Sequence, residues 1–282
     1  MKLKKSFSKL LLSLLLLTGV IIPGQIAHAG VLHPLGLKTL HEKISNVKKL
    51  PTSFGQSAIQ LPASVDLSSF LPSVQNQGSL GSCVAFATTY AKSYEENAKN
   101  NWWGVATNNH IFSQSYMYSQ IHADNSADGG GCSFSDAFNL LDNQGCATLS
   151  DMPYNGNEYA YTTKPTSVQI ADAANYKSTS WTQLQNGNYT QIKQLLADGY
   201  PVVIGINVYP DFDNLSPSNP IYDNASGKSR GGHGLCVVGY DDQKQAVKII
   251  NSWGTGWGIN GYGWISYNLI KSQNMEAYYT VD

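Results

Sequence analysis

The chain has 282 residues, of which 42% are hydrophobic and 13% charged, and its formal net charge at pH 7 is −1. This hydrophobic content is sufficient for a full core and excludes an intrinsically disordered protein. Arg230 is the only arginine and the sequence has no basic stripe, which argues against a nucleic-acid-binding protein. The length allows one large domain or two lobes.

The first 29 residues have the features of a secretory signal peptide. Four lysines precede an apolar run over residues 10–22, and Ala27-His28-Ala29 is a small-x-small cleavage pattern. The apolar run is shorter than the roughly 20 residues that a transmembrane helix needs. We therefore expect cleavage after Ala29, a secreted, extracellular protein, and no membrane association after cleavage. The alternative is an uncleaved membrane anchor.

Residues 30–60 are expected to form a short pro-segment or leader. Apolar residues at three- and four-residue steps predict one short amphipathic helix there: Leu37, Leu40, Ile44 and Val47. The segment carries four lysines and one glutamate, whereas the chain that follows is acidic. We hypothesise that its helix and lysines lie across the acidic body and block the active site. A disordered N-terminus is the alternative.

The body, residues 61–282, changes its pattern near the middle. Helical periodicity predicts helices over 83–99, around 111–117, over 134–141 and over 190–197, with loop-like sequence over 155–190. Runs typical of strands follow at 202–208, 234–240, 246–251, 262–267 and 277–281. We therefore predict an α+β protein of two lobes, with a helical lobe over about 61–165 and a strand lobe over about 166–282.

The body contains four cysteines, which are Cys83, Cys132, Cys146 and Cys236. Cys132 and Cys146 flank a predicted helix of about ten residues, which spans roughly 15 Å. A disulfide needs Cα atoms within about 7 Å, so this pair is not expected to bond. We expect a protein without disulfides that is held together by its core.

Cys83 lies in the run Gln77-Gly-Ser-Leu-Gly-Ser-Cys83, at the start of a predicted helix. A helix N-terminus lowers the pKa of a thiol because its unpaired N–H groups favour an anion. The thiolate is the nucleophilic form of cysteine. This segment therefore indicates a reaction site.

A catalytic thiolate needs a base, and the base needs an orienting partner. His233 is distinctive among the six histidines because glycines flank it directly before a predicted strand, where other backbone can approach closely. Asn251 ends a later strand, and its side-chain carbonyl can accept from an imidazole and fix the tautomer. Each residue alone is compatible with a structural role, but together with Cys83 they indicate catalysis.

Two other functional classes are disfavoured. Gly256-x-Gly258-x-x-Gly261 fits the dinucleotide-binding fingerprint, but a strand rather than a helix is predicted after it. No pair of cysteines or histidines has zinc-like spacing. We expect neither a cofactor nor a metal ion.

These segments together resemble the papain-like cysteine peptidases, with the motifs in that family's order of Gln, Cys, His and Asn. The resemblance runs from about residue 61 to the C-terminus and looks closer to secreted bacterial members. It implies a papain-like two-lobe α+β fold with a helical N-terminal lobe, a β-barrel-like C-terminal lobe and the active-site cleft between them. The matching residues are Gln77, Gly81-Ser82-Cys83, Ala85-Phe86, Gly232-His233, Asn251-Ser252-Trp253-Gly254, Trp257-Gly258 and Gly261-Tyr262-Gly263.

The resemblance also implies a role for each matching residue. Cys83 is the nucleophile, His233 is its ion-pair partner and later the general acid, and Asn251 orients His233. The Gln77 side-chain amide and the Cys83 backbone N–H form the oxyanion hole. Trp253 shields the contact between Asn251 and His233 from water.

The sequence departs from the family pattern at three places. Leu80 replaces the usual cysteine three residues before the nucleophile, so the disulfide to a Cys132-like cysteine is expected to be absent. Val84 replaces a common tryptophan, and Phe134-Ser135 replaces a glycine pair that lines the substrate groove. Substrate preference therefore does not follow from the resemblance.

We predict a secreted, monomeric cysteine peptidase that acts on protein or peptide substrates through an acyl-enzyme thioester at Cys83. The alternatives on the same scaffold are a non-catalytic binding protein and an acyl-transferring relative.

Overall fold

The computed structural model describes residues 32–38, 47–55, 60–102 and 107–282. The predicted signal peptide, its cleavage site and most of the predicted leader helix lie outside these residues. Residues 32–282 belong to one compact unit. In the part of the chain that is described, no helix combines the length and hydrophobicity needed to cross a bilayer.

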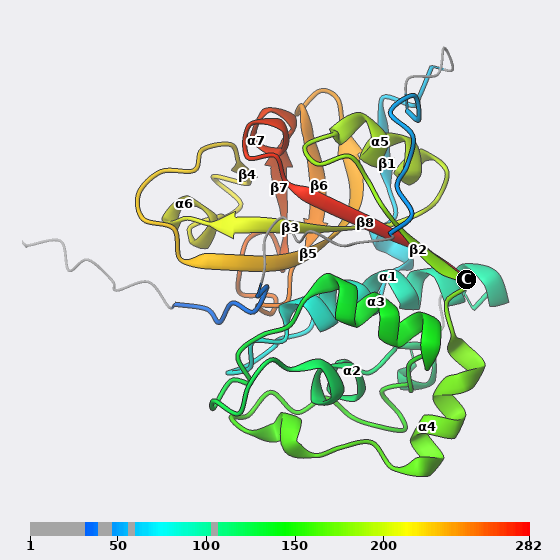
Figure 1. Ribbon diagram of the computed structural model, residues 1–282. Helices are drawn as coiled ribbons and strands as arrows, with labels where there is room; N and C mark the ends of the chain where they lie inside the picture. Colours follow the sequence, from blue (N-terminus) through cyan, green and yellow to red (C-terminus); the bar gives the residue numbers. More distant parts are fainter. Residues whose placement is uncertain (1–31, 39–46, 56–59, 103–106) are drawn as a thin grey trace, which may run out of the picture. The chain divides into compact units, whose positions relative to one another are not determined.

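The first half of the body is helical, as predicted (Figure 1). Ser113, Ser133 and Thr166 cap α2, α3 and α4, because each side chain accepts a backbone N–H of the first turn. The helix α1 lacks such a cap, since Ser82 makes no side-chain capping bond, and its first amides stay available. The helices of this half are α1 (Cys83–Asn100), α2 (Gln114–Ile121), α3 (Phe134–Asn143) and α4 (Ser167–Ala173), with 3₁₀ turns at Ser68–Phe70, Asn108–His110, Ala160–Thr162 and Ala174–Tyr176.

The second half is built on one largely antiparallel sheet with the order β2-β8-β3-β5-β6-β7-β4. β1 pairs separately with β5, and only the short β4–β7 pair is parallel. The strands are β1 (Ser64–Asp66), β2 (Ser180–Gln183), β3 (Val202–Val208), β4 (Ile221–Tyr222), β5 (Gly231–Asp241), β6 (Ala246–Ile250), β7 (Tyr262–Ser266) and β8 (Glu276–Val281). Three helices accompany them: α5 (Tyr189–Ala197), α6 (Pro210–Asp213) and α7 (Tyr267–Ser272).

The sheet separates two hydrophobic clusters. Val203 of β3 packs with the helical residues around Phe86 and Phe138, whereas its neighbours Val202 and Ile204 pack in a second cluster with α5 and α7. This alternation follows from the period of two in a strand. The predicted α+β division into a helical part and a sheet part is thereby confirmed. Ala173 of α4 lies in the first cluster, so helical packing continues past residue 165.

The contact between α1 and β5 brings the two parts together. A Cβ atom added to Gly234 of β5 would lie 3.1 Å from the Cα of Val84 in α1. Glycine at this position therefore allows the first turn of α1 to approach the strand closely. The approach sets Cys83 beside the residues that follow His233.

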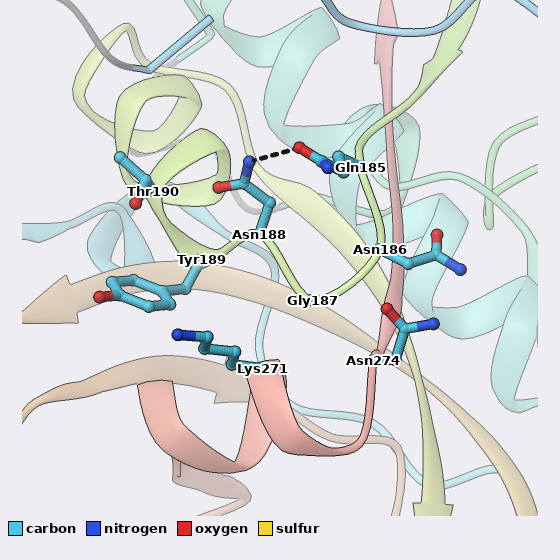
Figure 2. A pocket seen from close by; sticks show the side chains of 8 residues that line it. All are labelled: Gln185, Asn186, Gly187, Asn188, Tyr189, Thr190, Lys271 and Asn274. Carbon is cyan, nitrogen blue, oxygen red and sulfur yellow. Dashed lines mark hydrogen bonds between the residues drawn. The ribbon is translucent and has the colours of Figure 1, made fainter. Parts of the chain in front are cut away.

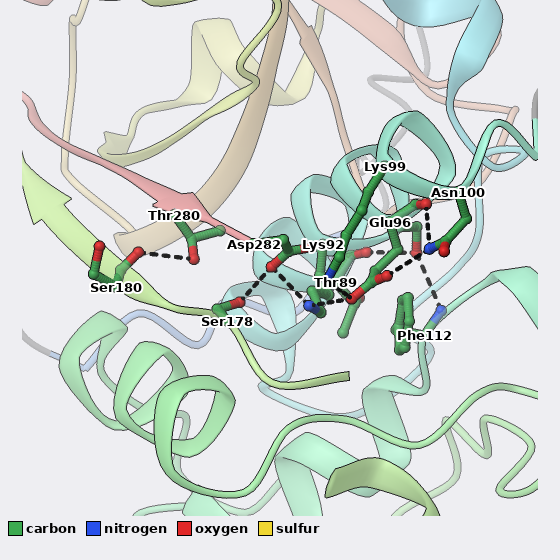
Figure 3. A network of polar contacts seen from close by, with 11 residues as sticks. Thr89, Lys92, Glu96, Lys99, Asn100, Phe112, Ser178, Ser180, Thr280 and Asp282 are labelled. Atoms are coloured by element: carbon green, nitrogen blue, oxygen red, sulfur yellow. Dashed lines mark hydrogen bonds and ion pairs between the residues drawn. The ribbon is translucent and has the colours of Figure 1, made fainter. Parts of the chain in front are cut away.

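Farther along α1, charged side chains are buried in a polar network (Figure 3). Lys92 Nζ lies 2.8 Å from Glu96 Oε1 and 2.7 Å from Asp282 Oδ1, and the Ser178 hydroxyl donates to the same Asp282 oxygen. Nearby, neither carboxylate oxygen of Glu95 has a hydrogen-bond partner among the described residues. Burial, followed by repulsion from Asp282, raises the pKa of Glu95 well above its usual value.

Candidate active site

Cys83 is the first residue of α1 and its side chain is fully buried, with 0% exposure. The backbone N–H of Gly234 donates to its sulfur, with 3.3 Å between N and Sγ. Burial raises the pKa of the Cys83 thiol to about 11, although four backbone N–H groups oppose this effect. The amides of Cys83 and Val84 at the helix N-terminus are among the four, so the helix acts in the predicted direction but burial outweighs it.

His233 lies on β5 and is held by Asn251, which follows β6. Its Nε2 is 2.8 Å from Asn251 Oδ1, and the N–H of Ser252 donates to the same oxygen at 2.7 Å. Because that oxygen accepts from an amide, His233 Nε2 must be the protonated nitrogen. Its Nδ1 is buried and has no hydrogen-bond partner among the described residues. Burial lowers the pKa of His233 to about 4, despite the bond to Asn251.

Trp253 covers this pair. The Trp253 ring lies 4.6 Å from the His233 ring at an interplanar angle of 33°. The same indole stacks on His33 of the leader, also at 4.6 Å and with 13° between the planes. The indole thus lies between two imidazoles, beside the His233 ring that Asn251 holds, where the family resemblance implies it.

Gln77 is buried and connects two parts of the site. Its Nε2 donates to the carbonyl of Leu80 at 2.8 Å, and its Oε1 accepts from the Ser252 hydroxyl at 2.6 Å. Its backbone N–H also donates to the Ser252 carbonyl at 2.8 Å. An amide NH₂ carries two protons, so one remains for another acceptor. The structure thus gathers Gln77, Cys83, His233 and Asn251 around the junction of α1, β5 and β6.

The leader passes directly over this junction. Leu37 donates its N–H to the Gly232 carbonyl at 3.1 Å, and Lys38 donates to the Cys132 carbonyl at 3.0 Å. In return, the N–H of Cys132 donates to the Gly36 carbonyl at 2.8 Å, and the N–H of Gly36 points at the Cys83 sulfur. Residues 36–38 therefore form an extended segment, bridged at Leu37, between the helical part and the sheet.

The expected helix does not include Leu37. This residue is extended and 5% exposed, and it pairs in parallel with Cys132 and antiparallel with Gly232. Its three- and four-residue spacing with later apolar residues is typical of a helix, but backbone pairing on both sides fixes the extended form. Residues 39–46, which would hold most of that helix, lie outside the described residues.

Further contacts hold the beginning of the described leader. The Arg230 guanidinium donates to the His33 carbonyl at 2.6 Å and also pairs with Asp213. The Trp253 indole N–H donates to the Pro34 carbonyl at 3.2 Å. Sequence reasoning assigned no role to His33, Pro34 or Arg230. The sequence feature that could have indicated this contact is Arg230, which is the single arginine and lies close to His233.

The backbone beside the leader also differs from the expectation. The sequence comparison placed the missing glycine pair at Phe134-Ser135, after Cys132. In the structure, the glycine that lies against the leader precedes Cys132, because a Cβ atom added to Gly131 would be 2.3 Å from the Gly36 carbonyl oxygen. The run of three glycines at 129–131 was the available signal.

The expected absence of disulfides agrees with the structure, in which all four cysteines are free. No cluster of three or more His, Cys, Asp or Glu side chains that could hold a metal ion occurs in the described part of the chain. The glycine fingerprint that ends at Gly261 is followed by strand β7, without the helix that dinucleotide binding requires.

A polar pocket lies away from the predicted site residues (Figure 2). Its volume is about 380 Å³, and it is lined by the loop before α5, the start of α5, Lys271 of α7 and Asn274 in the α7–β8 connection. The Asn188 amide donates to Gln185 Oε1 at 3.1 Å across this loop. None of the four predicted site residues lines it. The lining residues are Gln185, Asn186, Gly187, Asn188, Tyr189, Thr190, Lys271 and Asn274.

Comparisons with known proteins identify the family. The family model described as "Papain family cysteine protease" matches residues 61–281. A cathepsin B-like protein, CP3, from Giardia intestinalis is 30% identical over 231 residues, which cover 77% of this chain and 72% of that protein. A cathepsin L-like protein from Caenorhabditis elegans is 28% identical over 265 residues, covering 84% and 75%.

Solved structures share the fold. Xylellain, a cysteine protease from Xylella fastidiosa, superposes with a TM-score of 0.72 at 24% identity, covering 88% of this chain and 96% of that one. Digestive procathepsin L 3 from the Tenebrio molitor larval midgut gives a TM-score of 0.67 at 23% identity, covering 84% and 75%. The family model and the curated relatives define a cysteine-type hydrolase. The chain belongs to the papain family of cysteine proteases.

Proposed function

We propose that this papain-family peptidase is secreted and that Cys83, His233, Asn251 and Gln77 perform peptide-bond hydrolysis. The observation that carries the proposal is the orientation of His233. Asn251 occupies Nε2 and leaves Nδ1 unpartnered, while the next residue, Gly234, contacts the Cys83 sulfur. The free nitrogen is therefore the one available to exchange a proton with the thiol.

The steps follow from this arrangement. His233 Nδ1 takes the thiol proton, and the Cys83 thiolate attacks the substrate carbonyl carbon. The oxyanion accepts hydrogen bonds from the Cys83 backbone N–H and the remaining N–H of Gln77. The imidazolium then protonates the leaving amine. A water molecule, deprotonated by the imidazole, hydrolyses the thioester and releases the acid product.

The leader is proposed to hold this machinery inactive. The group that it directs at the Cys83 sulfur is the N–H of Gly36, not a carbonyl carbon, and the Gly36 carbonyl is occupied by Cys132. A thiolate is acylated by attacking a carbonyl carbon, so an amide that presents its N–H side to the sulfur is not cleaved. 

Burial also keeps Cys83 and His233 uncharged while the leader is in place, because it raises the pKa of Cys83 and lowers the pKa of His233. The covered site therefore holds a thiol and a neutral imidazole rather than the reactive ion pair.

Steric fit explains how closely the leader is seated. A Cβ atom added to Gly36 would lie 1.8 Å from the Gly81 carbonyl oxygen, so no other residue fits there without a shift of the backbone. Such a shift typically costs about 1–3 kcal/mol. Gly36→Ala should therefore release the leader and raise peptidase activity about tenfold or more. Leu32→Ala, at a residue that is 74% exposed, is the matched control and should leave activity unchanged.

The catalytic assignment is tested in the full chain carrying Gly36→Ala, with a thiol-directed epoxide and a peptide library. We expect the epoxide to label Cys83, and we expect Cys83→Ala to abolish both labelling and cleavage. Cys146→Ala, which removes another buried thiol, should preserve both. Cleavage that persists in the Cys83→Ala variant would refute the assignment.

The other readings of the scaffold predict different results. A non-catalytic binding protein would leave Cys83 no more reactive than a free thiol. An acyl-transferring relative would pass the acyl group to an added amine in preference to water. Secretion and the monomeric state are checked by finding Gly30 as the first residue of the exported protein and by measuring its mass in solution.

A further inference from the structure

Two cysteine sulfurs lie at the N-terminus of α1. The amides of Cys83 and Val84 point at the Cys83 sulfur, and the next amide, that of Ala85, points at the sulfur of Cys132. Successive amides of one helical turn are close neighbours. Both side chains are buried and both thiols are free. The second sulfur has no part in the proposed hydrolysis.

The backbones that carry these cysteines are also in contact. A Cβ atom added to Gly81, two residues before Cys83, would lie 3.0 Å from the N atom of Gly131, which precedes Cys132. Gly36 of the leader touches both cysteines, because its N–H points at the Cys83 sulfur and its carbonyl accepts from the Cys132 N–H. A single residue of the leader thus spans the distance between them.

We propose that Cys132 is a resolving cysteine, which forms a reversible disulfide with Cys83 after hydrogen peroxide has oxidised Cys83. The inference rests on the proposed role of Cys83 as a reactive nucleophile. Low-pKa cysteines that are oxidised reversibly often have a second thiol beside them. In the family pattern, a cysteine at the position of Leu80 would form a structural disulfide with Cys132. Because this residue is a leucine here, the Cys132 thiol is free to react.

The reaction proceeds in two steps. The Cys83 thiolate attacks one peroxide oxygen, an S–O bond forms, the O–O bond breaks, and the departing hydroxide takes up a proton to give water. Cys132 then attacks the sulfur of the sulfenic acid, the S–S bond forms, and the S–O bond breaks. The hydroxide that leaves takes the Cys132 thiol proton. Two thiols and one peroxide thus give one disulfide and two water molecules.

The seated leader prevents this reaction. Gly36 lies against both cysteines, and burial raises the pKa of both thiols. Oxidation to the disulfide is therefore expected only after the leader has moved away. The disulfide would then withdraw the nucleophile from catalysis and protect it from further oxidation.

The experiment uses the full chain with Gly36→Ala, treated with hydrogen peroxide and then with dithiothreitol. We expect the mass to fall by two hydrogen atoms, peptide mapping to find Cys83 linked to Cys132, and dithiothreitol to restore most of the activity. With Cys132→Ser added, Cys83 should instead gain two or three oxygen atoms, and dithiothreitol should restore little of that variant's own starting activity. Cys146→Ser is the matched control and should behave like the parent.

Peptide mapping of the parent decides the matter even if the Cys132→Ser variant does not fold. Conversion of Cys83 to its sulfinic acid with no link to Cys132 would overturn the inference. Peptide mapping detects the Cys83–Cys132 disulfide by its mass, so this result does not depend on whether the protein cleaves peptides. A link in a chain that cleaves no peptide would refute the peptidase assignment alone, and cleavage without a link would refute the resolving cysteine alone.

Discussion

The Gln77 side-chain amide is held by two hydrogen bonds, and its second N–H is the proposed oxyanion-hole donor. Its oxygen accepts from the Ser252 hydroxyl, and one N–H is bonded to the Leu80 carbonyl. These bonds fix the orientation of the amide before any substrate arrives. Donors that are fixed in advance need no reorganisation when the oxyanion forms, which is the main source of their catalytic effect.

Replacing Gln77 by glutamate keeps the acceptor and removes the donor. The carboxylate can still accept from Ser252, but it cannot donate to an oxyanion and would repel it. We expect kcat of Gln77→Glu to fall by about 10²–10³-fold, the usual effect of losing one oxyanion-hole donor. Gln243→Glu, at an exposed position, is the control for the added charge. An unchanged kcat in a folded Gln77→Glu protein would show that the donor lies elsewhere.

At the scale of elements, α1 carries both Cys83 and a buried ionic network. Cys83 is the first residue of the helix. Lys92, Glu95 and Glu96 are buried more than two turns farther along it. The cation of Lys92 is shared by Glu96 and Asp282 (Figure 3). Glu95 has no hydrogen-bond partner among the described residues. An unpaired buried carboxyl avoids the cost of a charge by staying protonated.

The raised pKa of Glu95 makes stability depend on pH. The folded state holds this proton more tightly than the unfolded state, so the contribution is fully present below the unfolded pKa, near 4.5, and is lost as pH rises through the folded pKa. Within that window the free energy of unfolding should fall by up to about 1.4 kcal/mol per pH unit. Glu95→Gln should remove this slope and stabilise the protein at neutral pH.

Urea unfolding of both proteins at several pH values provides the measurement. Glu158→Gln is a matched surface control, since Glu158 is exposed. Identical slopes for the parent and Glu95→Gln would mean that the Glu95 carboxyl is ionised in the folded protein.

Elements with a clear local signal were predictable, and those that depend on distant partners were not. Residues 83–99 lack glycine and proline and gave α1 almost completely, and 202–208 gave β3 with its observed ends. Residues 155–190, expected to be loop-like, contain α4 and β2. Their many polar residues obscure both the helical and the strand periodicity, so the sequence does not reveal these elements. The extended form of Leu37 depends on Cys132 and Gly232, which are far away in sequence.

The same limit applies to the site. Gln77, Cys83, His233 and Asn251 were found by motif and are gathered in the structure, while their catalytic roles stay a proposal. The thiol pKa was predicted to fall because of the helix N-terminus. The structure raises it to about 11 because the leader and the core bury the sulfur. Burial by a segment elsewhere in the chain cannot be read from the residues around Cys83.

At the scale of the whole molecule, the leader joins the helical part to the sheet, and His33 makes this connection sensitive to pH. Burial lowers the pKa of His33, with Asp213 opposing this effect and Arg230 adding to it. The seated leader thus favours the neutral imidazole. Its stabilisation is present above the ordinary pKa of about 6.5 and is lost as pH falls through the lowered pKa.

We therefore expect the leader to dissociate more readily as the solution becomes acidic. The rate of epoxide labelling at Cys83, divided by the rate in the Gly36→Ala protein, should rise as pH falls below about 6.5. His33→Gln should flatten this ratio, and His122→Gln, a histidine outside the leader, should not. A ratio that is independent of pH in the parent would exclude His33 as the titrating group.

The paired backbone of residues 36–38 has a consequence for what replaces it. When the leader departs, the Gly232 carbonyl, the Cys132 carbonyl and the Cys132 N–H lose their partners together. These three backbone groups could then form hydrogen bonds with any extended polypeptide, whatever its side chains. Binding of the substrate main chain should therefore not depend on the substrate's sequence. Selectivity between substrates should depend on the side chains that now pack around Leu37.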